Sequence, residues 1–229
     1  MPVKQILLQV AAMAPVTSIL FAALSAAATL TSFTDAASSP SPRLAVPPPP
    51  CVAPPSAAAF LRARCATTPY AVACYDTLIP YACTFQTSHI KLARAAADVN
   101  LAWLRGLSTR VKEVVARGST GAGVEAGALR DCASTVASAA GLAKQSAAEL
   151  ASLDAAGAAA ARNKVRWSIA NAQTWLSASM TNEATCVDGI GLAGAAASPV
   201  AREVVIGVLS AREHTTIALA LVNGIPVPS

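Results

Sequence analysis

The side chains that could do chemistry in this sequence are two histidines, six cysteines and one polar segment near residue 180. His89 and His214 each stand alone, without a second ligand at a metal-binding spacing. The sequence contains no H-E-x-x-H, C-x-x-C or G-x-S-x-G motif, and no lysine follows the glycine-rich stretch 118–123 as a phosphate loop would require. We therefore expect no metal site, no cofactor and no enzymatic activity.

The polar segment 174–190 reads TWLSASMTNEATCVDGI and combines a helical apolar stripe with short polar side chains. Trp175, Leu176 and Val187 have the spacing of a buried helix face. The Thr185 hydroxyl could form a hydrogen bond with the backbone one turn back, and the Asp188 side chain could stabilise the turn at Gly189. The alternative is an exposed surface that another protein contacts. The candidate contact residues are Thr185, Asp188, Asn182 and Glu183.

Composition favours a helical domain and excludes several classes of function. Of the 229 residues, 54% are hydrophobic, many of them alanine, and only 4% are aromatic, which suits closely packed helices better than a β-sandwich. The net charge of +5 comes from scattered residues, without a basic stripe interleaved with aromatics, so we expect no nucleic-acid partner. We interpret Trp103 and Trp167 as packing residues.

The first residues carry the pattern of a secretory signal peptide. Lys4 precedes a long uncharged run that reaches Asp35, with small-residue cleavage sites along it, and we assign residues 1–37 to the signal. The run is also long enough to act as a signal anchor. The proline-rich residues 38–55 are an exposed spacer, and residues 56–225 are the folded domain. Beyond the signal we expect no stable membrane association, and paired cysteines in an oxidising compartment.

Six helical segments are expected in the folded domain. Two short ones, with Ser56 and Thr68 as their caps, form a hairpin. Longer tracts begin near Ser88, at about Val124 and before Val165; the first ends in the stretch 118–123, the second near Gly157 and the third at Gly189, Gly191 and Gly194. Pro199 opens the last tract. The pattern predicts an all-α, up-and-down four-helix bundle preceded by a short N-terminal helical hairpin.

The cysteine spacing suggests pairs but does not decide them. Cys65 and Cys74 could close a small loop, and antiparallel helices could bring Cys132 to Cys186. Cys51 and Cys83 could pair or remain free. Spacing alone does not choose among the connectivities open to six cysteines.

Four segments of the domain together resemble a known family. They read FLRARCATTPYAVACYDTLIPYA, LRDCASTVASAAGLAKQSAAEL, AQTWLSASMTNEATCVDGI and EHTTIALALVN. In order and spacing they are similar to the plant invertase and pectin methylesterase inhibitor family, over about residues 56–223. The specific features are C-x₈-C in the hairpin, D-C in the second long helix and T-W-L-S-A…T-N-x-x-T-C-x-D-G in the third.

The resemblance implies a disulfide-braced helical bundle that is secreted to the cell wall or apoplast. It implies pairing of Cys65 with Cys74 and of Cys132 with Cys186, and leaves Cys51 and Cys83 unexplained. The implied partner is pectin methylesterase, whose substrate cleft the second and third bundle helices would cover in a non-covalent 1:1 complex. Thr185 and Asp188 fall at the contact positions. The family's charged and aromatic residues after D-C are replaced here by small side chains over 133–139.

Other functions remain open from the sequence. Within the family, the alternative target is a cell-wall or vacuolar invertase. From a different class, the chain could be a non-inhibitory extracellular helical binding protein, such as a lipid carrier, although those usually show adjacent Cys-Cys and Cys-x-Cys motifs that are absent here. A pro-region of a larger esterase is a further alternative.

Overall fold

The structure is a computed structural model that describes residues 51–118, 123–157 and 160–227, all of which belong to one compact unit. The predicted signal peptide, residues 1–37, and most of the predicted spacer, residues 38–55, lie outside the described residues.

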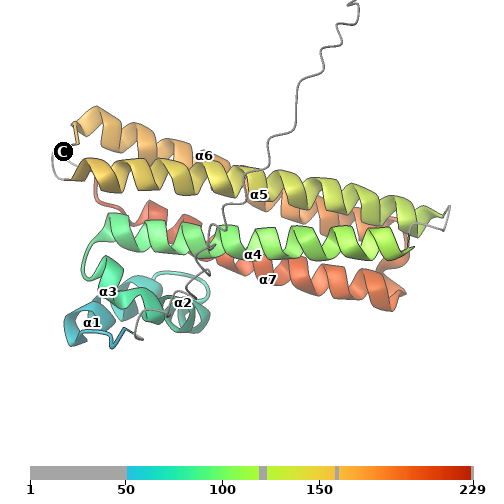
Figure 1. Ribbon diagram of the computed structural model, residues 1–229, viewed down its shortest axis with the longest axis horizontal. Helices are drawn as coiled ribbons and strands as arrows, with labels where there is room; N and C mark the ends of the chain where they lie inside the picture. The colour runs from blue at the N-terminus through green and yellow to red at the C-terminus, as the bar shows by residue number, and fades with distance from the viewer. Residues whose placement is uncertain (1–50, 119–122, 158–159, 228–229) are drawn as a thin grey trace, which may run out of the picture. The chain divides into compact units, whose positions relative to one another are not determined.

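Four long helices form an up-and-down bundle: α4 (His89–Gly118), α5 (Val124–Ala156), α6 (Arg162–Leu192) and α7 (Pro199–Asn223). Each packs against the next in chain order, and α7 returns to pack against α4 (Figure 1). The α5–α6 pair and the α4–α7 pair are therefore opposite sides of the bundle. The described residues contain no strand, and the predicted all-α four-helix bundle is confirmed.

The contact between α5 and α6 is built from small side chains. Ala139, Ala143 and Ala172 are fully buried, so the two backbones can approach closely. The hydroxyl of Ser179 donates to the Ala139 carbonyl at 3.2 Å, and that of Ser146 donates to the Ala172 carbonyl at 3.4 Å. These hydrogen bonds join one helix to the other and fix their register.

A helical hairpin precedes the bundle, as the sequence predicts. It consists of α1 (Pro55–Cys65), α2 (Ala71–Leu78) and a single turn, α3 (Ala82–Phe85), with a 3₁₀ turn at Ile79–Tyr81. Leu61, Leu78 and Phe85 are buried in the core cluster that also contains side chains of α4 and α7. The hairpin is thus part of the folded core.

The predicted helix starts are partly right. Ser198 caps α7 by accepting a hydrogen bond from the Ala201 amide, with Pro199 in the first turn. The predictions for Ser56 and Thr68 are wrong. Ser56 lies within α1, whose cap is Pro54, and Thr68 instead donates its hydroxyl to the Cys65 carbonyl at the end of that helix.

The third long helix does not end at its first glycines, contrary to expectation. Gly189 and Gly191 lie inside α6, and a left-handed Gly194 with φ of +66° follows the helix end. A glycine inside a helix costs about 1 kcal/mol relative to alanine. The buried side chains of Cys186 and Ile190 hold this last turn in place, so tertiary packing outweighs that cost.

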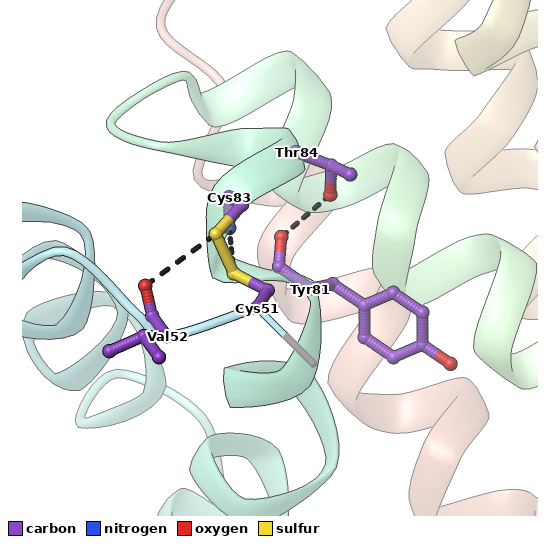
Figure 2. Close-up of a disulfide and its surroundings, with 5 residues drawn as sticks. All are labelled: Cys51, Val52, Tyr81, Cys83 and Thr84. Carbon is purple, nitrogen blue, oxygen red and sulfur yellow. Dashed lines mark hydrogen bonds between the residues drawn. A yellow bond between two sulfur atoms is a disulfide. The ribbon is translucent and has the colours of Figure 1, made fainter. Parts of the chain in front are cut away.

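Cys51 and Cys83 form a disulfide that ties the end of the proline-rich segment to the hairpin (Figure 2). The Cys83 amide also donates to Cys51 Sγ at 3.1 Å, and the Thr84 hydroxyl donates to the Tyr81 carbonyl at 2.6 Å. Cys83 is exposed, whereas Cys65 and Cys74, which link α1 to α2, are buried. The structure therefore resolves the open alternative for Cys51 and Cys83 in favour of a pair.

Among the described helices, α7 is long and apolar enough to cross a membrane. Val204, Val208 and Leu221 are buried against the neighbouring helices, whereas Ile206 and Leu209 are exposed. In this fold α7 is a core helix of the bundle.

Candidate functional site

The Cys132–Cys186 disulfide joins α5 to α6 and marks the centre of the candidate site. Both cysteines are buried, and their Cα atoms are 4.3 Å apart. The pairing agrees with the one that the family resemblance implies. Because the bond links two antiparallel helices that are also joined by serine hydrogen bonds, it holds the surface around it as a rigid platform.

The outer side of α6 carries a stripe of short polar residues. They recur at steps of three and four residues and are all exposed: Thr174, Ser177, Thr181, Thr185 and Asp188. The threonine hydroxyls donate to carbonyls one turn back, Thr181 to Ser177 at 3.1 Å and Thr185 to Thr181 at 2.9 Å. Each oxygen keeps its capacity to accept a hydrogen bond from a partner, in a rotamer that is already fixed.

The adjacent side of α5 also carries short polar side chains. Asp131, Ser134 and Ser138 are exposed at the same helical spacing. A groove of about 360 Å³ lies between the two helices over the disulfide, and Asp131, Thr135 and Thr185 are among its lining residues. We define the α5–α6 face as six residues: Asp131, Ser134, Ser138, Thr181, Thr185 and Asp188.

Three of the four predicted contact residues are accessible in the structure. Thr185 lines the groove, and Asp188 is exposed on the stripe one turn beyond it. Asn182 is half-buried, and its amide donates to the Ala178 carbonyl at 2.9 Å. The local role considered for Thr185, a hydrogen bond to the backbone one turn back, is therefore present, and its side chain is still exposed.

Glu183 is wrong as a predicted contact residue because its side chain has no exposed area. It lies four residues after Ser179 and three before Cys186, on the inward side of α6. Its carboxyl Oε1 lies within hydrogen-bond distance of the hydroxyls of Ser179, at 3.0 Å, and of Thr215, at 2.8 Å. Glu183 is a core residue that connects α6 to α7.

Burial raises the pKa of Glu183 to about 7, and the hydrogen bonds from Thr215 and Ser179 and the charge of Arg212 only partly oppose this shift. The Thr215 hydroxyl faces three acceptors, namely Glu183, the Asn100 side chain at 2.9 Å and the Ala211 carbonyl. One hydroxyl proton cannot serve all three. A protonated Glu183 can donate to Thr215, which can then donate to Asn100, so the network favours the neutral acid.

The sequence reasoning missed Asp131 and the rest of the α6 stripe. In the sequence Asp131 stands out only as the first residue of the D-C motif, yet it lines the groove together with Thr185. Of the small residues that follow it, Ala139 is fully buried and so does not belong to the exposed side of α5. The three- and four-residue spacing of Thr174, Ser177 and Thr181 before Thr185 was the available signal for the stripe.

The histidines do not form a catalytic arrangement with the described residues. His89 faces Arg64, with 3.4 Å between its Nε2 and the guanidinium, and burial together with that charge lowers the His89 pKa. His214 stacks on Trp103. No ion pair in the described part of the chain involves either ring.

The described ranges also hold no group of three or more histidine, cysteine or acidic side chains that could bind a metal ion. What the α5–α6 face offers instead is a set of pre-positioned, short polar groups on a rigid support. Such a surface can dock against another macromolecule with little loss of side-chain entropy.

This chain is similar to known proteins in sequence and in fold. The family profile described as plant invertase/pectin methylesterase inhibitor matches residues 59–221. Pectinesterase inhibitor 10 from Arabidopsis thaliana is 31% identical over 167 residues, which cover 72% of this chain and 50% of that protein. This chain therefore spans about half the length of that relative.

Pectinesterase inhibitor 9 from the same plant is 32% identical over 165 residues, covering 72% of this chain and 79% of that protein. Among solved structures, a mutant form of a pectin methylesterase inhibitor from Arabidopsis aligns with a TM-score of 0.55 at 19% identity, over 72% of this chain and 95% of that one. The similarity to this solved structure shows the fold alone.

Proposed function

Because the chain belongs to the plant invertase/pectin methylesterase inhibitor family, we propose that it inhibits pectin methylesterase by covering the enzyme's substrate cleft in a non-covalent 1:1 complex. The two Arabidopsis relatives described above are named inhibitors, and the chain is accordingly not an enzyme. The α5–α6 face is the surface that we assign to the enzyme.

The single observation that supports this assignment most is the polar stripe of α6 over the buried Cys132–Cys186 disulfide. Small side chains let a partner surface approach the two helices closely, and the helix carbonyls already hold Thr181 and Thr185 in place. The free energy of binding must then come from many small polar contacts, because the face has no aromatic anchor and only two charged residues, Asp131 and Asp188.

We also propose that the protein acts outside the cell, in the cell wall or apoplast. Residues 1–37 would be removed as a signal peptide, and residues 38–55 would remain as a spacer ahead of the inhibitor domain, residues 56–225. The three disulfides support this proposal, since disulfides persist in oxidising compartments.

A bulky cation in the middle of the α5–α6 face should block the complex. We expect Thr185→Arg to weaken binding to pectin methylesterase by about tenfold or more, or about 1.4 kcal/mol, because the longer side chain holds the two surfaces apart. The measurement is direct binding of the purified proteins by calorimetry, without polysaccharide.

The matched control is Thr109→Arg. Thr109 is an exposed threonine of α4 on the opposite side of the bundle, and its hydroxyl donates to the Arg105 carbonyl one turn back, as that of Thr185 does to Thr181. It should bind as the parent does. Equal losses for both variants would rule out the α5–α6 face as the contact surface.

Asp188→Ala separates a contact role from a local structural role. We expect it to weaken the complex while the melting temperature stays nearly unchanged, because the carboxylate is exposed. A large fall in melting temperature would instead make Asp188 a residue that stabilises the end of α6.

A further inference from the structure

Trp167 is a large aromatic side chain of α6 that the fold leaves in water. With 69% of its surface exposed, it is the most exposed tryptophan, tyrosine or phenylalanine among the described residues. The helix around it is fixed, because Val165 and Ile169 are buried. The Ser168 hydroxyl also donates to Glu149 Oε1 of α5 at 2.7 Å. Trp167 therefore presents its indole to solvent from a rigid part of the bundle.

Trp167 lies on the same side of α6 as the polar stripe. It precedes Thr185 by eighteen residues, which is five full turns of an α-helix, so the two side chains leave the helix in the same direction. Thr174, Thr181 and Asp188 follow Trp167 at steps of seven residues, or about two turns each. The α6 part of the α5–α6 face is therefore continuous with Trp167.

The stripe from Trp167 to Thr185 has the length of one protein–protein interface. Eighteen residues of α-helix rise about 27 Å. A typical stable interface buries about 800 Å² on each partner, which corresponds to a patch about 30 Å across. α5 packs beside α6 (Figure 1). The exposed residues between the two ends are small, so they do not hold a partner away from the indole: Ala170, Thr174, Ser177 and Thr181.

Cations without an acidic partner accompany Trp167 at the start of α6. Arg162, Lys164 and Arg166 are exposed and form no ion pair with any described residue. The helix dipole disfavours positive charge at a helix N-terminus, so these cations do not stabilise α6. Lys164 lies next to the indole, one turn before it, and its Nζ donates to Ser152 Oγ of α5 at 3.3 Å. The stripe thus has a cation beside its aromatic end.

The other end of the stripe is acidic. Asp131 of α5 and Asp188 of α6 are exposed there, near Thr185. Opposite charges at the two ends favour a protein partner whose charges run in the reverse order, and they disfavour the same partner turned round. They also disfavour a linear polyanion, because such a chain would need cations along the whole stripe and would meet Asp188 instead.

We propose that Trp167 is the aromatic anchor of the complex with pectin methylesterase. Its indole enters an apolar hollow of the enzyme, and oxygen acceptors at the rim of that hollow bind the indole N–H and the Lys164 ammonium. This inference rests on the proposed function and supplies the large side chain that the α5–α6 face lacks. A tryptophan suits this role because it buries a large area while only two side-chain torsions lose their freedom.

Calorimetric titration of the purified protein with a pectin methylesterase tests the anchor. We expect Trp167→Ala to weaken binding by about thirtyfold, or about 2 kcal/mol, and Trp167→Phe to retain part of the affinity. The melting temperature of Trp167→Ala should stay near that of the parent, because the ring is exposed. The matched control is Trp103→Ala, which removes a tryptophan of α4 that is 49% exposed on the opposite side of the bundle and should bind as the parent does.

A second pair of variants tests the charge beside the indole. Lys164→Glu should weaken binding, and the loss should shrink as salt is added. Lys112→Glu reverses an exposed, unpaired cation of α4 and should leave the affinity unchanged. Equal losses in these two variants would mean that only the net charge of the protein matters, and would overturn the role of Lys164.

Fluorine NMR of protein labelled with fluorotryptophan shows the contact without relying on affinity. The chain has three tryptophans, and replacing each by phenylalanine assigns its signal. We expect the signal of Trp167 to shift when the enzyme saturates the protein, while that of Trp103 stays in place. An unchanged Trp167 signal in the saturated complex would overturn the proposal.

The remaining outcomes separate this inference from the proposed function. If the parent does not bind the enzyme, both fail; if the parent and Trp167→Ala bind it equally tightly, the anchor alone fails. Two faces of this chain could also dock in opposite directions, so sedimentation equilibrium should find the parent monomeric. A dimer that Trp167→Ala dissociates would assign the indole to a contact between copies and overturn the proposal. Unchanged enzyme affinity of Trp167→Ala with lost binding of a de-esterified oligogalacturonate would assign it to a polyanion and also overturn it.

Discussion

Replacing both Cys132 and Cys186 by alanine should lower the free energy of unfolding by about 4 kcal/mol. The bond closes a loop with a sequence separation of 54 residues, and the chain-entropy model gives a term of this size for such a loop. Alanine is the suitable replacement, since both cysteines are buried and alanine adds no polar group to the core. Urea unfolding followed by circular dichroism measures the loss.

The same variant should also inhibit less well, because α5 and α6 can then shift relative to each other beneath the α5–α6 face. The comparison is Cys51→Ala with Cys83→Ala, which removes the disulfide between the proline-rich segment and the hairpin and leaves α5 and α6 joined. We expect this second variant to retain inhibition. A stability loss below about 1 kcal/mol for the first variant would mean that helix packing alone supports the face.

Stability should fall as the pH rises through the range in which Glu183 ionises. Its pKa is about 7 in the folded protein, against the usual 4.5. Between these values the folded state binds the proton more tightly than the unfolded state does. The contribution of Glu183 to the free energy of unfolding is therefore fully present below pH 4.5 and is lost as the pH rises through 7. This loss lowers the free energy of unfolding by about 3 kcal/mol at most.

Glu183→Gln isolates this effect. The amide stays neutral at every pH. We therefore expect the difference in the free energy of unfolding, variant minus parent, to become more positive as the pH rises from 4.5 to 8. His89 acts in the opposite sense, because its lowered pKa makes stability rise with pH, but it is present in both proteins and cancels in the difference. A difference that does not change with pH would show that Glu183 is already ionised in the fold at acidic pH.

The sequence was sufficient for the bundle because its helices are long and strongly periodic. Leu104, Val136, Leu176 and Val208 are all fully buried, as expected from residues on apolar stripes of four amphipathic helices. Helix ends were less predictable. Proline and glycine signals located the start of α7 and the turn at Gly157, whereas packing around Ile190 carried α6 past two glycines.

Whether a single side chain is buried or exposed depends on contacts between helices, and residue spacing in the sequence does not show these contacts. Glu183 is an ionisable residue in a polar segment, so the sequence predicts a surface position. In the fold its side chain is buried beside Thr215, which in turn contacts Asn100. Its position between Ser179 and Cys186 on the inward side of α6 was the only local sign of burial. Trp103 and Trp167 are expected from the sequence to be packing residues, but 49% and 69% of their surfaces are exposed.

Titration of the purified mature protein against a pectin methylesterase and an acid invertase decides whether it is an inhibitor and of which enzyme. We expect stoichiometric loss of methylesterase activity and no effect on invertase activity. Loss of invertase activity alone would move the target to the other enzyme that the family description names. Full activity of both enzymes at saturating protein would contradict the inhibitor assignment.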